Sequence, residues 1–179
     1  GLKLSLRKSR FYQQEFDFLS FRITKKGLML TDDKVKAIKE FERPTTISGV
    51  QRYLGIANFC SKFIARYSDI SAALSDLTRG TQKFKWTAVE EEAFQKIKQA
   101  IISETVLAFY DYRLPLTMAT DASRRAGGNV LVQRCPTDGE RIIAFHSRKW
   151  SVTEGTKFSS LELEILAIID GLTKLSFYT

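Results

Sequence analysis

Three short runs with the character of β-strands constrain the fold more than any other feature of this chain. They cover residues 114–121, 129–134 and 141–146, and a turn containing Pro136 and Gly139 separates the last two. The first run alternates with a period of two, which is typical of a strand with one buried face. Because short turns join the runs, we expect an antiparallel meander.

Helical patterns surround this meander. Thr87 and Glu90 have the spacing of a capping box and predict a helix before it, followed by a short strand over 106–110. A final helix is expected over roughly 159–175. Its predicted buried stripe consists of Leu161, Ile165, Ile168 and Leu172.

The first 30 residues have the alternation of two or three antiparallel strands, in 2–6 and again in 16–24. Helical patterns follow them. We expect one helix from Thr31 to Pro44, a second opening at 45–46, and a third with the buried stripe Ile70, Ala73, Leu74 and Leu77. Residues 79–82 are typical of a linker.

The positive charge is concentrated in the first half of the chain. Residues 1–86 hold 17 Lys and Arg against 8 Asp and Glu, a balance of +9, whereas residues 87–179 hold 11 against 12, a balance of −1. A basic half favours contact with a polyanion such as a nucleic acid backbone. The alternative is a solvated basic surface without a partner.

Composition excludes some classes of protein. No apolar stretch approaches the roughly 20 residues of a membrane span, and 44% hydrophobic residues suffice for a globular core. Cys60 and Cys135 lack the spacing of metal ligands, so reduced thiols in an intracellular protein are expected. The chain does not begin with Met and shows no signal peptide, which favours a piece of a longer protein.

Asp121 is the candidate ligand of a metal ion. It lies at the end of the first alternating run, beside a turn expected over 124–128. A carboxylate placed there is suited to hold a divalent metal ion. An aspartate that caps the backbone of its own turn is the alternative.

The order of several sequence segments carries a family resemblance. They are residues 2–5 with Phe11, 18–24 (FLSFRIT), 34–38, 43–46, 53–59 (YLGIANF) with 63–64, 84–87 with 92–94, and 120–123 (TDAS) with 143–148 and 162–168. Nearly the whole chain thereby resembles the reverse transcriptase of gypsy-type LTR retrotransposons, and retroviruses more distantly. The resemblance runs from the primer grip through the thumb and connection into the first half of ribonuclease H. The family usually has glycine at the position of Ser20.

The resemblance implies a metal site for cleaving the RNA strand. Two-metal hydrolysis uses two ions roughly 3.5 to 4 Å apart. Asp121 would be the first catalytic metal ligand and Glu164 the second. Glu162 lies about 200° from Glu164 around a helix, so only one of them can face the sheet. The remaining carboxylates would follow Thr179, so we expect Mg²⁺ or Mn²⁺ in the intact parent, weak metal binding here and no efficient cleavage by this chain alone.

The polymerase part would provide binding only, since no Tyr-x-Asp-Asp motif occurs. The resemblance implies that basic residues contact the template-primer backbone and that two phenylalanines brace the primer end. Each basic residue could also be an ordinary solvated side chain. The candidates are Lys3, Arg7, Lys8, Arg10, Phe18, Phe21, Lys25, Lys26, Lys34 and Lys36, with Arg124 and Arg125 beside the expected metal site.

We therefore expect an α+β chain, with a small strand hairpin and a helical thumb bundle followed by a ribonuclease H-like α/β domain truncated after its first long helix. The expected segments are 1–30 (end of palm and primer grip), 31–82 (thumb), 83–113 (connection) and 114–179 (partial ribonuclease H-like domain).

The expected function is that of a reverse transcriptase and ribonuclease H fragment. It would bind an RNA/DNA hybrid or a template-primer duplex and the rest of its polyprotein, in a cytoplasmic particle or the nucleus. The alternatives are a non-catalytic remnant, or host-adopted copy, that binds nucleic acid or protein, and a purely structural connection module.

Overall fold

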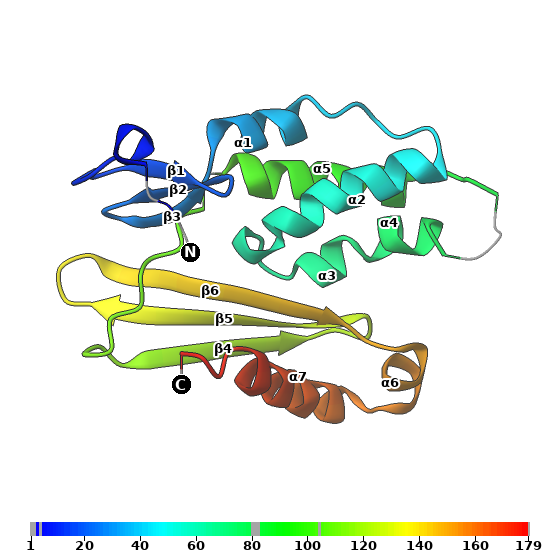
Figure 1. The fold of residues 1–179 in the computed structure, drawn as a ribbon. Helices are drawn as coiled ribbons and strands as arrows, with labels where there is room; N and C mark the ends of the chain where they lie inside the picture. Colours follow the sequence, from blue (N-terminus) through cyan, green and yellow to red (C-terminus); the bar gives the residue numbers. More distant parts are fainter. Residues whose placement is uncertain (1–2, 4, 80–82, 104, 179) are drawn as a thin grey trace.

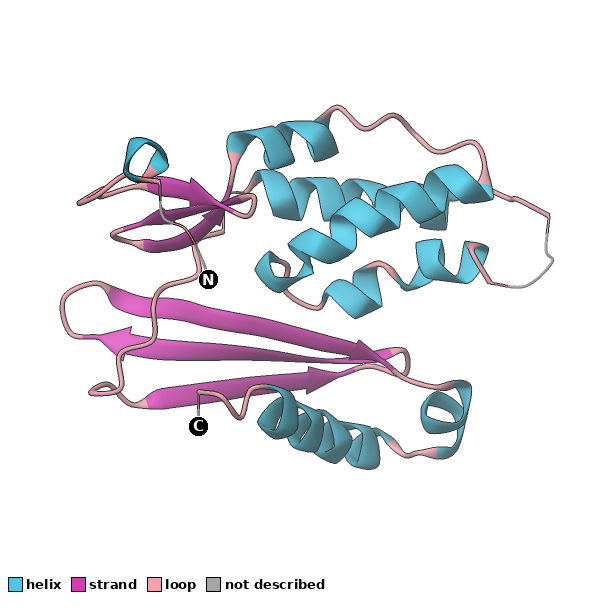
Figure 2. Cartoon of the chain, in the orientation of Figure 1, coloured by secondary structure: helices cyan, strands magenta, loops and turns pink. Residues whose placement is uncertain are grey.

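The computed structural model describes residues 3, 5–79, 83–103 and 105–178. It contains two antiparallel sheets and a group of helices, in agreement with the expected α+β class. The larger sheet lies between two helical layers, with α7 (Ser160–Lys174) on one face and the helical bundle on the other (Figures 1 and 2). Residues 2 and 4 and most of the predicted linker, residues 80–82, lie outside the described part of the chain.

The first sheet has three strands, β1 (Phe16–Phe18), β2 (Phe21–Thr24) and β3 (Gly27–Leu30), in the order β1-β2-β3. Leu19 and Ser20 form the turn between β1 and β2, with φ values of 49° and 68°. A positive φ at Ser20 is the conformation that glycine adopts at little cost. The extended structure predicted for the first residues is wrong at Leu6–Lys8, which form a short 3₁₀ helix.

The bundle contains α1 (Asp32–Lys39), α2 (Ile47–Cys60), α3 (Tyr67–Ile70), α4 (Ala72–Leu77) and α5 (Ala88–Ile102), with a 3₁₀ turn over Ser61–Phe63. Thr46 caps α2 by accepting a hydrogen bond from the Gly49 amide. The third predicted helix is wrong as a single element. It is divided between α3 and α4 at Ser71, although Leu74 is buried as expected.

Helix α5 begins with the predicted capping box of Thr87 and Glu90. Its buried residues Phe94, Ile97 and Ile101 belong to the same hydrophobic cluster as the buried residues of α2, including Tyr53. The expected connection segment therefore shares a core with the expected thumb. The predicted segment boundaries themselves stay a prediction.

Residues 105–108 join the two sheets. The Leu107 amide donates to the Leu28 carbonyl at 2.9 Å, the Leu28 amide donates to the Leu107 carbonyl at 2.8 Å, and the Ala108 amide donates to the Ile142 carbonyl at 2.7 Å. The predicted strand over 106–110 is thus wrong, because only an isolated bridge forms there. Gly27 permits the approach, since a Cβ atom there would lie 2.2 Å from the Leu107 oxygen.

The second sheet is the predicted meander of β4 (Leu116–Ala122), β5 (Ala126–Cys135) and β6 (Gly139–Lys149), paired in that order. Side chains of β4 alternate between half-buried and exposed, as expected of a strand with one covered face. The expected turn is shorter than predicted. It ends at Arg125, and residues 126–128 already belong to β5.

Helix α6 (Val152–Lys157) leads into α7, which spans the predicted range. The predicted buried stripe of α7 is wrong, because Leu161, Ile165, Ile168 and Leu172 are all exposed. The packed side instead carries Leu163, Ala167 and Gly171. Small residues let the helix approach the sheet so closely that a Cβ atom on Gly171 would lie 2.4 Å from the Asn129 side-chain oxygen.

Among the described residues, no helix has the length and apolar character needed to cross a membrane. Both cysteines are free thiols, with Cys60 buried in the bundle and Cys135 partly exposed at the end of β5.

Candidate functional site

The two predicted catalytic carboxylates lie on different elements, Asp121 on β4 and Glu164 on α7. Thr120 is paired with Asn129, which lies against Gly171 of α7. Asp121, the next residue, is paired with Gly128, which lies against Arg66 of the bundle. Because neighbouring side chains on a strand point to opposite faces, Asp121 faces the bundle and not α7, the helix that carries Glu164.

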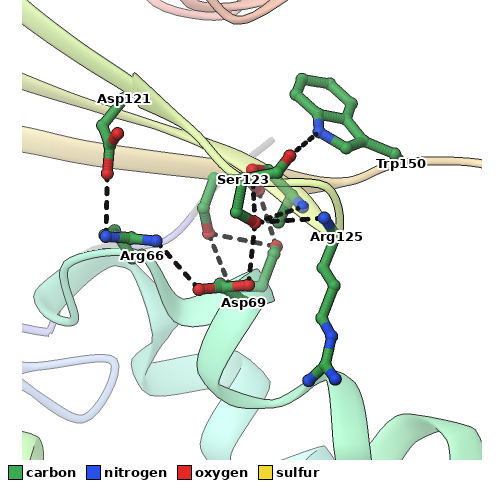
Figure 3. A network of polar contacts seen from close by, with 9 residues as sticks. Arg66, Asp69, Asp121, Ser123, Arg125 and Trp150 are labelled. Atoms are coloured by element: carbon green, nitrogen blue, oxygen red, sulfur yellow. Dashed lines mark hydrogen bonds and ion pairs between the residues drawn. The ribbon is translucent and has the colours of Figure 1, made fainter. Parts of the chain in front are cut away.

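Asp121 takes part in a polar network between the sheet and the bundle (Figure 3). The Arg66 guanidinium lies 2.8 Å from a carboxylate oxygen of Asp121 and 3.0 Å from one of Asp69. The Ser123 hydroxyl donates to the other oxygen of Asp69 at 3.0 Å, and the Trp150 indole donates to the Ser123 carbonyl at 2.9 Å. The network therefore ties the end of β4 to the start of α3.

Glu164 is exposed on α7. Its neighbour Glu162 forms a capping box with Ser159, whose amide donates to the Glu162 carboxylate at 2.7 Å. This backbone hydrogen bond from Ser159 holds the pKa of Glu162 below its usual value. The Glu162 carboxylate therefore caps the start of α7. Glu164, which is not part of this capping box, remains the candidate metal ligand.

The described residues do not fit a metal site. They contain no group of three or more His, Cys, Asp or Glu side chains placed to hold an ion. Asp121 is already paired with a cation, Arg66, and Glu164 belongs to the layer on the other face of the sheet. The role of both residues as metal ligands remains a prediction.

The third acidic residue of α7, Asp170, contacts the sheet. Its carboxylate lies 2.7 Å from the His146 Nε2 atom and 3.1 Å from the Arg148 Nε atom. Both partners come from β6. Asp170 therefore fastens α7 to the sheet, and His146, the only histidine, has a structural role in this contact.

Asn129 is the least satisfied polar residue on this face. It is only 5% exposed, and within the described structure neither its side-chain oxygen nor its nitrogen has a hydrogen-bond partner. Leaving a buried amide unpaired costs about 1–3 kcal/mol.

The two arginines of the β4–β5 turn have different surroundings. The Arg124 guanidinium donates to the Phe158 carbonyl at 3.0 Å, which ties the turn to the start of α7. The Arg125 side chain is exposed, and its backbone amide donates to the Ser123 hydroxyl. Arg125 is the better placed of the two to contact a phosphate.

Most predicted nucleic-acid contacts of the amino-terminal half are exposed. Lys34 is half-buried, with its ammonium 5.2 Å from the centre of the Phe59 ring, and the Lys36 ammonium lies 4.0 Å from Glu40. The exposed set consists of Lys3, Arg7, Lys8, Arg10, Lys25, Lys26 and Lys36.

The two predicted aromatic contacts differ. Phe18 is 57% exposed, so its ring is available to a partner. Phe21 instead stacks on Phe59, with ring centres 4.9 Å apart and planes 8° apart, and the Lys62 ammonium lies 3.5 Å from its centre. Burial lowers the pKa of Lys62. Phe21 therefore packs the hairpin against the bundle.

Arg66, which is paired with Asp121, is not among the residues that the sequence predicts for the site. It adopts a left-handed backbone conformation with φ 54° and ψ 33°, immediately before α3. No local sequence signal marks it, because the glycine or asparagine usual at such positions is absent.

Comparison with known proteins agrees with this architecture. Residues 86–179 match the model of the RNase H-like domain found in reverse transcriptase. The chain is 34% identical to the retrovirus-related Pol polyprotein from transposon opus of Drosophila melanogaster, over 99% of this chain and 19% of that protein. It is 28% identical to the transposon Tf2-3 polyprotein of Schizosaccharomyces pombe, over 96% and 13%. It thus spans less than a fifth of these relatives.

Solved structures extend the agreement to the whole chain. A foamy viral protease-reverse transcriptase in complex with an RNA/DNA hybrid matches with a TM-score of 0.79 and 29% identity, over 97% of this chain and 24% of that one. The same protein's dRH form in complex with double-stranded DNA also matches with a TM-score of 0.79, over 30% of its length. The predicted resemblance and fold class are confirmed, whereas the gypsy-type assignment stays a prediction. The chain belongs to the family of RNase H-like domains found in reverse transcriptase.

Proposed function

We propose that this chain is the part of a reverse transcriptase that holds a nucleic-acid duplex, either an RNA/DNA hybrid or a template-primer. The observation that carries the proposal is its similarity, over 97% of its length, to a foamy viral enzyme solved with an RNA/DNA hybrid. The excess of nine positive charges in residues 1–86 supports it.

Backbone contacts are the form of binding that this surface supports. The exposed basic residues Lys3, Arg7, Lys8 and Arg10 come shortly before β1, and Phe18 is exposed at the end of that strand. Such side chains neutralise phosphates without reading bases, so the affinity should depend strongly on salt and weakly on sequence.

Fluorescence anisotropy with a labelled RNA/DNA hybrid and a labelled DNA duplex tests this proposal. Reversing the charge of Lys3, Arg7, Lys8 and Arg10 to Glu should lower the affinity for both duplexes. It should also reduce the slope of log affinity against log salt by about 0.9 for each phosphate that the variant no longer neutralises.

A matched control carries the same four reversals at exposed basic residues elsewhere, namely Lys96, Arg134, Lys157 and Lys174. Equal decreases in affinity for the two variants would mean that net charge alone governs binding. That result would overturn the assignment of the amino-terminal surface.

Cleavage of the RNA strand with Mg²⁺ or Mn²⁺ is a proposal about the intact parent protein. Asp121 and Glu164 are its candidate ligands, but in this chain Arg66 is paired with the first and α7 holds the second on the other side of the sheet. We therefore expect no efficient cleavage by the 179-residue chain. Robust metal-dependent cleavage that Asp121→Asn abolishes would contradict this expectation.

The rest of the polyprotein is the second proposed partner. The exposed apolar side of α7, formed by Leu161, Ile165, Ile168, Ile169 and Leu172, suits further elements of the same RNase H-like domain. The relatives extend far beyond the matched segment, since this chain covers only 19% and 13% of their lengths.

A non-catalytic module that binds nucleic acid or protein is the alternative. The engagement of Asp121 by Arg66 favours it. The parent sequence after Thr179 distinguishes the two, since further acidic residues on the following elements would complete the metal site.

A further inference from the structure

The bundle and the larger sheet are joined by polar contacts on one side. The Ser68 amide donates to the Ser147 hydroxyl at 2.9 Å, and the Ser68 hydroxyl donates to the Ser147 carbonyl at 3.0 Å. The Lys149 ammonium lies 2.6 Å from the Asp76 carboxylate. These contacts run along α3, α4 and β6, and the Arg66 network continues them to β4.

Arg66 keeps a costly backbone conformation at this junction. A non-glycine residue in the left-handed region is strained, and such residues persist where the surroundings fix them. Here both ends of the guanidinium are engaged, one by Asp121 and the other by Asp69. The side chain thus has two fixed points on different elements.

The sheet leaves space for this arginine. Gly128 lies opposite Asp121 in β5, and a Cβ atom on Gly128 would lie 3.1 Å from the Arg66 Cγ atom. The stem of Arg66 therefore rests on bare backbone while its guanidinium reaches the neighbouring strand. Three independent features converge on one side chain: a strained backbone, a glycine beneath it and carboxylates at both ends.

We propose that Asp121 in this chain is the anchor of an interdomain latch, in which Arg66 fastens the bundle to the sheet. The Arg66 guanidinium occupies the place of a cation at Asp121, and Asp69 and Ser123 hold it there. Asp121 is thus a positioning residue that fixes how the bundle sits on the sheet. This role goes beyond duplex binding and does not depend on it.

Amide hydrogen exchange measured by NMR on the 179-residue chain tests the latch. The reporter is the Ser68 amide, which is bonded across the junction to Ser147. Asp121→Asn removes the charge at nearly constant shape. Arg66→Gly removes the guanidinium, and with it the contacts to both Asp121 and Asp69, while it relieves the strained backbone, so faster exchange in this variant does not arise from added backbone strain.

Each single variant should speed exchange of the Ser68 amide by about two- to fivefold, the factor expected for an ion pair between half-exposed side chains. The double variant should add nothing further, because either change already breaks the pair. Arg125→Ala, which removes an exposed arginine from the same turn, should leave the exchange rate unchanged.

Mn²⁺ provides the second readout on the same sample. If the latch occupies Asp121, Mn²⁺ should broaden the Asp121 amide signal no more than that of Asp138, an exposed carboxylate in the β5–β6 turn. Selective broadening at Asp121 and Glu164 in the unaltered chain would overturn the proposal. Additive effects of the two variants on exchange, or an equal effect of Arg125→Ala, would also overturn it.

Discussion

The Tyr53 hydroxyl donates a hydrogen bond to the backbone carbonyl of Phe94 at 3.1 Å, and the two rings pack with their centres 4.6 Å apart. Tyr53 is on α2 and Phe94 on α5, 41 residues later in the chain. This pair joins the expected thumb to the expected connection segment through a buried contact. Burial raises the pKa of Tyr53, so the hydroxyl stays protonated as a donor.

Removing this hydroxyl should destabilise the bundle. Tyr53→Phe keeps the ring contact and removes one buried hydrogen bond, so the free energy of unfolding should fall by about 0.5–1.5 kcal/mol. Urea denaturation followed by circular dichroism measures it. Tyr112→Phe, at an 84% exposed position, should change nothing. An equal effect of both variants would contradict the assigned contact.

Two helical glycines should respond to alanine in opposite directions. Gly171→Ala places a methyl group against Asn129 and Met118 and should destabilise the chain by about 1–3 kcal/mol despite the better helix propensity of alanine. Gly55→Ala, on the open side of α2 with no other atom within 4 Å, should stabilise it by about 0.5–1 kcal/mol. Thermal unfolding of both variants tests the packed side of α7, and a stabilising Gly171→Ala would refute it.

Alanine variants of Phe18 and Phe21 should affect different quantities, the first duplex affinity and the second the free energy of unfolding. Phe18→Ala removes an exposed ring, so duplex affinity should fall by about 1–3 kcal/mol if a base stacks on it, with little change in unfolding. Phe21→Ala removes the ring packed on Phe59 and should lower the free energy of unfolding by about 2–4 kcal/mol. Anisotropy and urea denaturation on the same samples distinguish them. A Phe18 variant with normal affinity would exclude that ring from the binding surface.

The start of α7 should be sensitive to acid. The folded-state pKa of Glu162 lies below its unfolded value because of hydrogen bonds from Ser159. Its contribution to stability is therefore complete above the unfolded pKa and is lost as the pH falls through the folded pKa. The urea midpoint of Glu162→Gln should depend less on pH across this acidic interval than that of the unaltered chain. Parallel pH profiles would show that the capping box does not form in solution.

The two thiols should differ in reactivity. Burial raises the pKa of Cys60 to about 11, whereas hydrogen bonds from Thr137 lower the pKa of Cys135. Because the thiolate is the reactive form, iodoacetamide at neutral pH should modify Cys135 first and Cys60 only on unfolding. Mass spectrometry of tryptic peptides identifies the modified residue. Early modification of Cys60 would mean that the bundle opens readily.

The strands of the larger sheet were predictable because the alternation of 114–121 and the turn residues that bound the other two runs are features of the local sequence. The packed side of α7 was not. Counting bulky apolar residues selects Leu161, Ile165, Ile168 and Leu172, whereas the sheet accepts Ala167 and Gly171, since closeness of approach decides this contact. The sequence also predicts one helix where the structure has α3 and α4. Ser71 separates them, and a serine is not a local signal that a helix ends.

The sequence predicted that Asp121 belongs to the candidate site. It did not predict which face of the sheet Asp121 occupies or which residue is paired with it. The TDAS sequence identified Asp121, but which face of the sheet it occupies depends on the strand's register with β5. Its partner Arg66 lies 55 positions earlier and adopts a backbone conformation that no local pattern signals. The sequence departure at Ser20 was informative, because the structure requires a positive φ where the family usually has glycine.

If the chain holds a duplex as proposed, the bridge formed by Leu28, Leu107 and Ala108 has a consequence for the length of duplex that it covers. Hydrogen bonds on both sides of one short segment hold the β1–β3 hairpin at a set distance from β6. A duplex that touches both sheets has to span that distance whatever its sequence. Footprints on RNA/DNA hybrid and on DNA should therefore share one spacing between protected regions, and the backbone of residues 105–108 sets it.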